Sequence, residues 1–282
     1  MKREVIAQKD PKSPIAEVFR TLRTNIQFMN SKKGLQTLLV TSTMPEEGKS
    51  WVSANLATTF AQAGKKTLLI DADMRKGRIH KIFGTTNVPG LSNYLSGIDE
   101  EDNVKSNITK HIRQTEIENL YIMPAGNVPP NPSELLADDE MIRMIEEFKK
   151  YFDFIILDGT PCILVTDSII LSRIVDTTVI VAEHKKTRKD NLIKVKKAIE
   201  NVGGKIAGVV INKVPVNISK YNSSYYYSSS RKDRNTRKSE YEELVKEDVT
   251  QYKVRSNYNI SKNKQEEILK QLNDYLGKDK TE

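Results

Sequence analysis

Residues 43–50 constrain this chain more than any other segment. They read Thr-Met-Pro-Glu-Glu-Gly-Lys-Ser, follow the apolar run 38–40 and precede a helix-like segment that starts at Trp51. A strand, a tight turn ending in Gly-Lys-Ser, and a helix form the context of a phosphate-binding P-loop. Backbone N–H groups in such a turn and at the helix N-terminus point at a phosphate. We predict that Lys49 reaches the β- and γ-phosphates and that the Ser50 hydroxyl holds Mg²⁺.

Two further apolar runs end in carboxylates. The run 68–70 is followed by Asp71, Asp73 and Arg75, and the run 154–157 is followed by Asp158. Side chains at i and i+2 share one face of a strand, so Asp71 and Asp73 can converge on one metal–phosphate centre. An Asp at the end of a buried strand holds Mg²⁺ in P-loop enzymes. Each Asp taken singly could equally be a helix cap or a turn residue, but their combination with a P-loop favours the metal–phosphate site.

The apolar runs of the chain alternate with helical patterns. Runs occur at 67–70, 120–123, 154–157, 178–182 and 206–211, and helical candidates at 132–150, 167–174 and 188–202. This alternation predicts an α/β fold of the P-loop NTPase type, a mostly parallel sheet with helices on both faces. Ligands bind beyond the carboxyl ends of the strands in such sheets, where the three carboxylates and the P-loop would meet.

The N-terminal segment predicts a helix. Ser13 is a candidate N-cap, and Pro14 stands at the first helical position. Apolar residues then recur at helical spacing and predict one buried face: Ile15, Phe19, Leu22, Ile26 and Met29. On another face lie Glu17, Arg20 and Arg23, whose spacing alone favours a solvated surface with intrahelical ion pairs over a protein contact.

Composition limits the class of protein. The net charge of +8 and the pI near 9.2 suggest an acidic partner, such as a nucleotide, a nucleic acid or an anionic membrane face. A single cysteine, Cys162, excludes an internal disulfide framework and indicates a reducing compartment. We interpret it as a small packing residue. The sequence shows neither a signal peptide nor an apolar run of about 18 residues, so we expect a cytoplasmic chain.

The composition changes after about residue 215. Residues 217–236 are rich in Ser, Asn, Tyr and basic side chains, and we predict a mobile tail that contains a tyrosine cluster. The cluster comprises Tyr221, Tyr225, Tyr226 and Tyr227. Further on, residues 264–277 carry an apolar stripe at helical spacing and predict one short helix.

Together these motifs resemble the bacterial tyrosine kinases (BY-kinases) that control capsule and exopolysaccharide production, over about residues 1–230. The family follows its P-loop with apolar-Asp-x-Asp-x-Arg, matched by residues 71–75, and with apolar-Asp-x-x-Pro, matched by residues 158–161. Its oligomerisation signature, Glu-x-x-Arg-x-x-Arg, is matched by residues 17–23, which reverses the reading from spacing alone. Residues 128–136 and the tyrosine cluster match as well. One point differs from the family pattern: the family's tyrosine cluster usually lies near the chain end, whereas about 55 residues follow Tyr227 here. Separately, Thr43 stands where the general P-loop pattern has its first glycine.

The resemblance implies a protein-tyrosine kinase that uses ATP and Mg²⁺ and autophosphorylates its tyrosine cluster. It implies four domains: 1–35 for the N-terminal helix and oligomerisation motif, 36–215 for the kinase, 216–238 for the tyrosine tail, and 239–282 for an extension. The implied catalytic residues are Lys49, Asp71, Asp73 and Arg75. The implied nucleotide-binding residues are Glu47, Gly48, Lys49, Ser50, Trp51 and Asn212. The implied metal ligands are Ser50, Asp73 and Asp158. We favour Asp71 as the base, with Asp73 left open.

The resemblance also implies partners. It predicts the split family type, in which a transmembrane activator of the polysaccharide co-polymerase type holds the kinase at the inner face of the membrane. It further implies a homo-oligomeric ring, polysaccharide-pathway substrates and an opposing tyrosine phosphatase, with no nucleic acid. The tail from 220 to 238 carries a net charge of +5, which each phosphotyrosine lowers by about 1.5 to 2. We hypothesise that unmodified tails hold the ring together and that phosphorylation dissolves it.

Three alternatives compete with this reading. A partition or division-site ATPase switch shares the fold, but its signature lysine is replaced here by Met44. A nucleic-acid module that stacks bases on the tail tyrosines would leave the three carboxylates unexplained. A catalytically inactive scaffold is the third, because Glu46 and Glu47 would place negative charge beside the phosphates unless they point away.

Overall fold

The computed structural model describes residues 5–29, 34–97 and 108–215. The chain divides into two units, Met1–Asn217 and Ile218–Glu282, and all described residues belong to the first unit. The tyrosine cluster, the predicted helix at 264–277 and the domains 216–238 and 239–282 lie outside the described residues.

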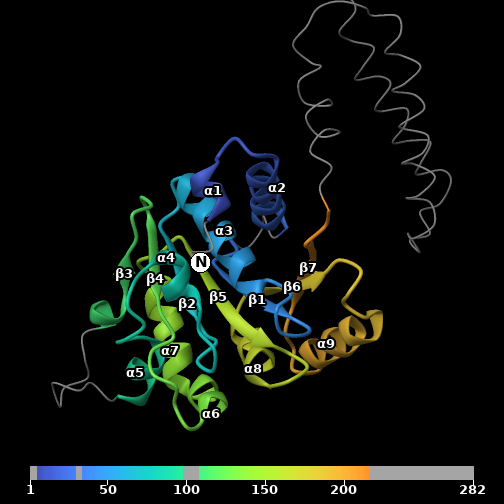
Figure 1. Cartoon of the computed structure of the whole chain (residues 1–282). Helices are drawn as coiled ribbons and strands as arrows, with labels where there is room; N and C mark the ends of the chain where they lie inside the picture. The colour runs from blue at the N-terminus through green and yellow to red at the C-terminus, as the bar shows by residue number, and fades with distance from the viewer. Residues whose placement is uncertain (1–4, 30–33, 98–107, 216–282) are drawn as a thin grey trace, which may run out of the picture. The chain divides into compact units, whose positions relative to one another are not determined.

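One seven-stranded sheet forms the centre of the first unit (Figure 1). Its strands are β1 Thr37–Ser42, β2 Thr67–Asp71, β3 Arg113–Gln114, β4 Leu120–Met123, β5 Phe154–Pro161, β6 Thr177–Glu183 and β7 Ile206–Asn212. Their order is β3-β4-β2-β5-β1-β6-β7, and all neighbours pair in parallel except β3 with β4. The predicted mostly parallel sheet is confirmed, and only the antiparallel strand β3 was not foreseen.

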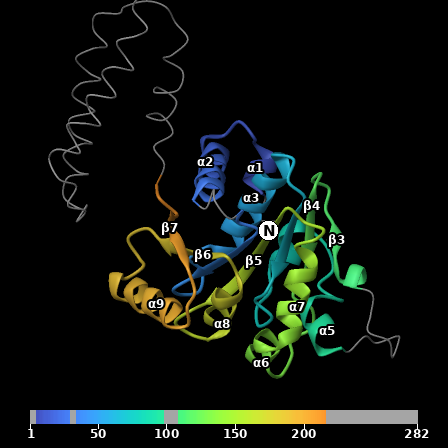
Figure 2. The same ribbon diagram turned by 180° about the vertical axis from the view of Figure 1, so that it is seen from behind.

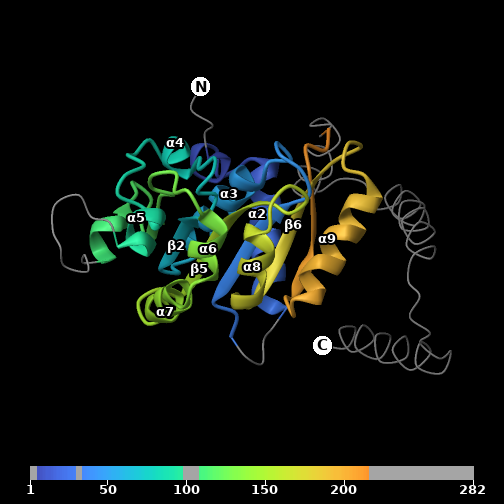
Figure 3. The same cartoon turned by 90° about the horizontal axis from the view of Figure 1, so that it is seen from below.

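Helices cover both faces of the sheet (Figures 1 and 2). Their bounds are α1 Ile6–Lys9, α2 Pro14–Phe28, α3 Lys49–Gln62, α4 Ile79–Phe83, α5 Leu91–Ser96, α6 Pro132–Ala137, α7 Asp139–Phe148, α8 Asp167–Ile174 and α9 Lys189–Asn201, with a 3₁₀ turn η1 at Ile108–His111. Helices α1 to α4 pack on the face that presents Leu38, Leu69 and Ile156. Helices α5 to α8 pack on the opposite face, which presents Leu39 and Ile155, and α9 extends that layer alongside β7 (Figure 3).

The central strands are buried on both faces. Every residue of β1 and β2 is buried, which accounts for their continuous apolar runs. Helix α3 is also buried on nearly all sides, because α2 packs on its outer surface and Phe19 meets Trp51 edge to face with ring centroids 5.2 Å apart. The P-loop helix is thus held between the sheet and the N-terminal helix.

Helix α2 begins as predicted but buries a narrower face. The Ser13 hydroxyl accepts a hydrogen bond from the Ala16 N–H at 3.2 Å, which confirms the cap. Phe19 and Ile26 are buried, whereas Ile15 and Met29 are 37% and 56% exposed, so their predicted burial is wrong. The reason is that, among the described elements, α2 makes its main contacts with α1 and α3, which leaves Ile15 and Met29 exposed.

The predicted helix at 132–150 is two helices, α6 and α7. Asp138 breaks it by adopting an extended conformation (φ −69°, ψ 148°), and its carboxylate accepts a hydrogen bond from the Glu140 N–H at 2.8 Å. An aspartate that caps a following turn competes with helix continuation. The apolar periodicity on either side hides this break, because both helices pack on the same face of the sheet.

Candidate functional site

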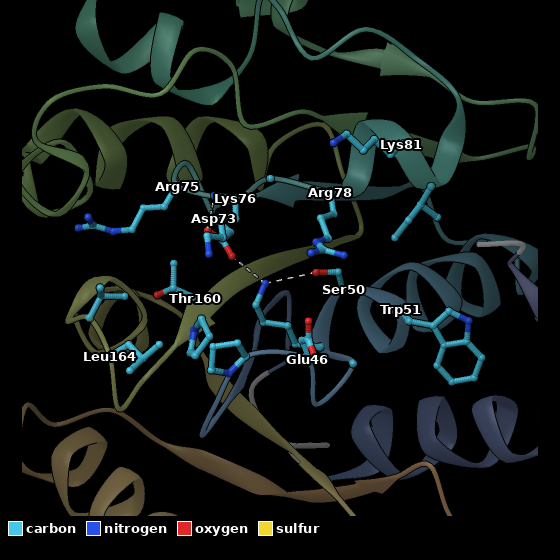
Figure 4. Close-up of a pocket in the computed structure, with 17 residues that line it drawn as sticks. Glu46, Ser50, Trp51, Asp73, Arg75, Lys76, Arg78, Lys81, Thr160 and Leu164 are labelled. Carbon is cyan, nitrogen blue, oxygen red and sulfur yellow. Dashed lines mark hydrogen bonds and ion pairs between the residues drawn. The ribbon is translucent and has the colours of Figure 1, made fainter. Parts of the chain in front are cut away.

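The carboxyl ends of β1, β2 and β5 meet at one pocket. In the sheet Asp158 of β5 pairs with Asp71 of β2 on one side and with Val40 of β1 on the other. The loop after β1 leads into α3, so the P-loop lies beside these carboxylates. A pocket of about 690 Å³ opens there, and its lining includes Lys49, Ser50 and Asp73 (Figure 4). The parallel register of β1, β2 and β5 therefore brings the P-loop and the strand-end carboxylates to the same edge of the sheet, as predicted.

The P-loop needs glycine at its last turn. Gly48 has φ 96°, in the left-handed region, and it is the N-cap of α3. A Cβ at this position would also collide with the side-chain amide of Asn212. Both observations explain why position 48, the first of the Gly-Lys-Ser signature, must be glycine.

Glu47 lies beneath the loop rather than in the phosphate site. Its carboxylate is buried and accepts hydrogen bonds from the backbone N–H groups of Thr43 and Met44 at 2.7 and 3.0 Å. The hydroxyls of Thr43 and Thr187 donate to its second oxygen. Four donors satisfy the buried carboxylate. Through these hydrogen bonds Glu47 links its own end of the loop to Thr43 and Met44 at the start of the loop, and to Thr187 after β6. Thr43, the departure from the usual glycine, supplies two of these donors.

Lys49 lies between two carboxylates. Its Nζ is 3.0 Å from Asp73 Oδ2, 3.7 Å from Asp158 Oδ2 and 3.3 Å from Ser50 Oγ (Figure 4). Burial by itself lowers the pKa of this amine, but the attraction of Asp158, Asp73 and Asp71 outweighs it and leaves the pKa raised. Lys49 therefore stays cationic, which is the state that binds a phosphate.

Asp71 and Asp158 are fully buried, and each keeps one oxygen without a hydrogen bond. Burial, followed by repulsion from Asp158, raises the pKa of Asp71 to about 7. Burial likewise raises the pKa of Asp158, against the attraction of Lys49. Such unsatisfied buried carboxylate oxygens are costly unless a cation or a proton reaches them.

These carboxylates fit a divalent cation that is shared with a nucleotide. Within residues 5–29, 34–97 and 108–215, no three His, Cys, Asp or Glu side chains are arranged to hold a metal ion by themselves. Mg²⁺ generally takes one or two carboxylates together with substrate phosphates and water, so a complete protein cage is not needed. The Ser50 hydroxyl and Asp73 line the pocket and could serve as ligands. Asp158 Oδ2, which accepts no hydrogen bond and lies 3.7 Å from Lys49 Nζ, is a further candidate ligand atom, although Asp158 is fully buried behind the lining.

Asp71 and Asp73 differ in access to the pocket. Asp73 lines the pocket, while Asp71 lies behind it, covered by Gly77, where a Cβ would stand 2.9 Å from Asp71 Oδ2. That Asp71 oxygen accepts hydrogen bonds from the N–H groups of Arg78 and Ile79 at 2.8 and 2.9 Å. The two carboxylates of the motif thus shape the turn after β2 as well as the pocket.

Arg75 points away from Lys49 (Figure 4). Its guanidinium donates to both oxygens of the buried Asp167 at 2.9 and 3.1 Å, and to Ser133 Oγ at 3.1 Å. The hydrogen bond to Asp167 raises the pKa of Arg75 further. In this conformation Arg75 joins the turn after β2 to α6 and α8, although it still borders the pocket.

The remaining predicted nucleotide ligands are close to the loop. Trp51 lines the pocket, and the side-chain amide of Asn212 donates to the carbonyl of Glu47 at 2.8 Å.

The predicted packing role of Cys162 agrees with the structure, since burial raises the pKa of its thiol to about 11 and keeps it a neutral thiol.

Several residues of the site were not anticipated from the sequence. Ser53 Oγ donates to Asp158 Oδ1 at 3.0 Å and orients that carboxylate. Ser53 lies one helical turn after Lys49 on the P-loop helix, which is a signal that the sequence contains. Thr187 and Asp167 carry no such signal, because only the tertiary fold brings them to Glu47 and Arg75.

The predicted oligomerisation residues form contacts within the subunit. Arg20 pairs with Glu17 at 2.8 Å and also donates to the Pro11 carbonyl. Arg23 donates to the Thr59 carbonyl of α3 at 2.8 Å.

Among the described residues, no helix combines the length and apolar character needed to cross a bilayer.

The fold and this loop define a P-loop nucleotide-binding protein. A family model described as an AAA domain matches residues 46–210. The putative tyrosine-protein kinase CapB of Staphylococcus aureus is 43% identical over 217 residues, covering 77% of this chain and 91% of CapB. The tyrosine-protein kinase YwqD of Bacillus subtilis is 37% identical over 229 residues, covering 81% of this chain and 93% of YwqD. The chain belongs to the bacterial tyrosine kinases, the BY-kinases.

Solved structures agree with this family. The crystal structure of the chimerical protein CapA2B2 has a TM-score of 0.70 at 39% identity and covers 75% of this chain and 90% of its own. The septum site-determining protein MinD of Pyrococcus horikoshii has a TM-score of 0.51 at 23% identity, a likeness of fold alone. The ATPase-switch alternative is accordingly the weaker one.

Proposed function

We propose that this chain is an ATP- and Mg²⁺-dependent protein-tyrosine kinase that phosphorylates its own cluster, Tyr221 and Tyr225 to Tyr227, and regulates capsule or exopolysaccharide synthesis. The observation that carries the proposal is the position of Lys49, which lines the P-loop pocket, between Asp73 and the buried Asp158. A cation between two carboxylates, one of them with a free oxygen, suits a phosphoryl group and its counter-ion.

The reaction forms a bond between the phenolic oxygen of tyrosine and the γ-phosphorus of ATP, and breaks the bond from that phosphorus to the β–γ bridging oxygen. ADP leaves, and the phenolic proton passes to a carboxylate. Backbone N–H groups at the start of α3 and the Lys49 ammonium group stabilise negative charge on the transferring group. Bound Mg²⁺, held by Ser50, Asp73 and Asp158, would neutralise phosphate charge. Arg75 would add to this stabilisation only after leaving Asp167.

Two carboxylates compete for the phenolic proton. A tyrosine phenol has a pKa near 10, so a base with a pKa near the working pH is the most effective. Asp71 meets that condition, since its pKa is raised to about 7 and its Oδ1 has no partner. Asp73 has the better access. We favour Asp71 as the base, reached when the turn at Gly77 moves, because catalytic contacts often tighten only in the substrate complex.

The family also supplies proposed partners. A transmembrane activator would hold the kinase at the inner face of the membrane, with polysaccharide-pathway proteins as further substrates and a phosphatase as the opposing enzyme. The exposed apolar side chains Ile15, Val18 and Phe28 of α2, and Met29 directly after it, support assembly of a homo-oligomer through this helix. Glu17, Arg20 and Arg23 lie on the same helix and would join that contact.

The test is incubation of the purified chain with labelled ATP and Mg²⁺, with and without the cytoplasmic segment of a candidate activator, followed by phosphosite mapping. We expect label on residues 221–227 of the wild type, and none in Lys49→Met or in the variant with all four clustered tyrosines changed to Phe. ATP hydrolysis without phosphotyrosine under every condition would contradict the proposal and favour an ATPase switch.

A further inference from the structure

Glu46 has a backbone conformation that is unusual for its residue type. Its φ is 66°, in the left-handed region, which glycine adopts without strain and most other residues avoid. Gly48, two residues later, has φ 96°. Left-handed residues in a loop of this kind turn backbone N–H groups into a concave site for an anion. The left-handed turn at residue 46 therefore belongs to the phosphate loop, and a glycine would form it with less strain.

The side chain of Glu46 adds a negative charge at this position. It is exposed and lines the pocket, and Figure 4 shows it with Ser50 and Asp73 around that pocket. No described residue forms an ion pair or a hydrogen bond with its carboxylate. Glu47, in contrast, is buried under the loop and has its own hydrogen-bond donors. Glu46 thus leaves an uncompensated negative charge beside the phosphate site.

The rest of the pocket lining is mainly cationic. Five basic side chains border the pocket: Lys49, Arg75, Lys76, Arg78 and Lys81. Positive charges attract a nucleotide more strongly when the nucleotide carries more negative charge. Because Mg²⁺ neutralises part of the phosphate charge, the basic lining by itself favours metal-free nucleotide over the metal-loaded form. Phosphoryl transfer requires the metal-loaded form, so this preference has to be opposed.

We propose that Glu46 is a specificity-determining residue that makes the pocket select metal-loaded over metal-free nucleotide. Its carboxylate repels the nucleotide phosphates, and the repulsion is larger when no Mg²⁺ neutralises them. It therefore counteracts the preference of the basic side chains at the place where the phosphates bind. This inference rests on the proposed ATP- and Mg²⁺-dependent function. It gives Glu46 no bond to the metal ion and no part in bond making.

This role differs from that of the candidate metal ligands. Asp73 and Asp158 lie 3.0 and 3.7 Å from Lys49 Nζ and would favour the metal-loaded form by binding the ion. Glu46 acts by repulsion from an exposed position, where charge interactions are modest and are screened by salt. We expect its effect to be about a two- to fivefold change in the relative affinity for the two forms at low ionic strength.

The test measures the dissociation constant of ADP for the full-length chain by titration calorimetry, in excess Mg²⁺ and in excess EDTA. ADP has no γ-phosphoryl group to transfer, so no kinase turnover disturbs the titration. Glu46→Gln removes the charge, and Glu46→Gly removes both the charge and the backbone strain. Glu118→Gln is the matched control, because Glu118 is an exposed glutamate in the turn between β3 and β4 and does not line the pocket.

The selectivity is the Kd in EDTA divided by the Kd in Mg²⁺. We expect wild type and Glu118→Gln to share one selectivity. Both Glu46 variants should lower it about two- to fivefold, mainly through tighter binding of metal-free ADP. About 0.5 M salt should remove most of this difference.

Unchanged selectivity in Glu46→Gln would overturn the proposal. Equal tightening of ADP binding in EDTA and in Mg²⁺ would also overturn it, because it would show repulsion without selection. Weaker binding by Glu46→Gln in Mg²⁺ alone would overturn it as well and make Glu46 a metal ligand. A chain that shows the expected selectivity but forms no phosphotyrosine with ATP would reject only the kinase function.

Discussion

At the scale of single residues, Glu47 shows how a carboxylate can be part of a phosphate loop without opposing the phosphate. Its oxygens are turned back under the loop and accept from Thr43, Met44 and Thr187. The concern that two loop glutamates would repel phosphate therefore applies only to Glu46, which borders the pocket. A hydrogen-bonded buried charge can stabilise a loop when every oxygen has donors.

Glu47→Gln should raise KM for ATP about tenfold with a smaller change in kcat. The amide group of Gln presents an N–H to donors that need an acceptor, which costs about 1 to 3 kcal/mol in loop geometry. Steady-state kinetics checks this, with Glu46→Gln as the comparison. That variant removes a negative charge from the pocket lining and should lower KM for ATP instead. Shifts of the same sign and size in both variants would contradict the assigned role.

The Asp71 carboxyl should set the acidic limb of the pH–rate profile. Because burial raises its pKa to about 7, the base form is lost as pH falls through 7, and kcat/KM should fall with it. Asp71→Asn should remove this limb together with most of the activity, by at least about a hundredfold. If the residual activity of Asp71→Asn keeps the same acidic limb, Asp71 is not the base, and Asp73 becomes the candidate.

The same shift makes a prediction about stability. The folded-state pKa of Asp71 lies above its unfolded value, so the folded state holds a proton that the unfolded state has lost between about pH 4 and 7. Asp71 therefore lowers the stability of the protein as pH rises through this window. Asp71→Asn keeps an oxygen for the Arg78 and Ile79 N–H groups and should raise Tm at pH 8 but not at pH 4. Thermal unfolding of both proteins measures these Tm values. An equal difference in Tm between Asp71→Asn and wild type at pH 8 and at pH 4 would contradict the prediction.

At the scale of elements, the Ser13 cap of α2 is a local interaction that can be predicted from the sequence. Ser13→Ala should destabilise the protein by about 1 kcal/mol, because the Ala16 N–H loses its acceptor. Denaturant unfolding with Thr21→Ala, an exposed position in the middle of the same helix, provides the control. An unchanged midpoint for Ser13→Ala would show that α3 packing alone holds α2.

Local signals and tertiary packing differ in how well they predict elements. The strands β2, β4, β5 and β6 were located from their apolar runs, because both of their faces are buried. The break at Asp138 was missed, since its capping role depends on a backbone conformation that periodicity does not report. The exposed ends of the α2 stripe were missed for a different reason. Apolar spacing predicts that a face will be covered but does not identify the partner that covers it.

At the scale of the whole molecule, the exposed apolar surface of α2 predicts assembly. Val18 is 55% exposed on this helix, beside the family's Glu17, Arg20 and Arg23. Val18→Glu should reduce the oligomer to monomers in light scattering, because a charge would be buried in the contact. Ile142→Glu, at a 42% exposed position of α7, is the control. An unchanged mass for Val18→Glu would exclude α2 from the contact.

The charge of the tail bears on the ring hypothesis. A tail with net charge +5 was predicted to dock in an anionic site of a neighbour. Basic side chains outnumber carboxylates in the lining of the pocket, so such docking depends on the negative charge that a bound nucleotide adds. Phosphorylation of the cluster reverses the charge of the tail. Comparison of oligomer mass for phosphorylated and Tyr→Phe protein tests the hypothesis, which requires a difference.

The sequence by itself determined the class of fold, the P-loop and the three strand-end carboxylates. These follow from local patterns: two-sided burial makes a strand continuously apolar, and a left-handed turn before a helix requires Gly48. Only the tertiary structure decided that Glu47 turns under the loop to Thr187 and that Arg75 is held by Asp167. It also decided that Asp71 is covered while Asp73 faces the pocket. Contacts between residues far apart in the chain depend on strand order and helix packing, which no local spacing encodes.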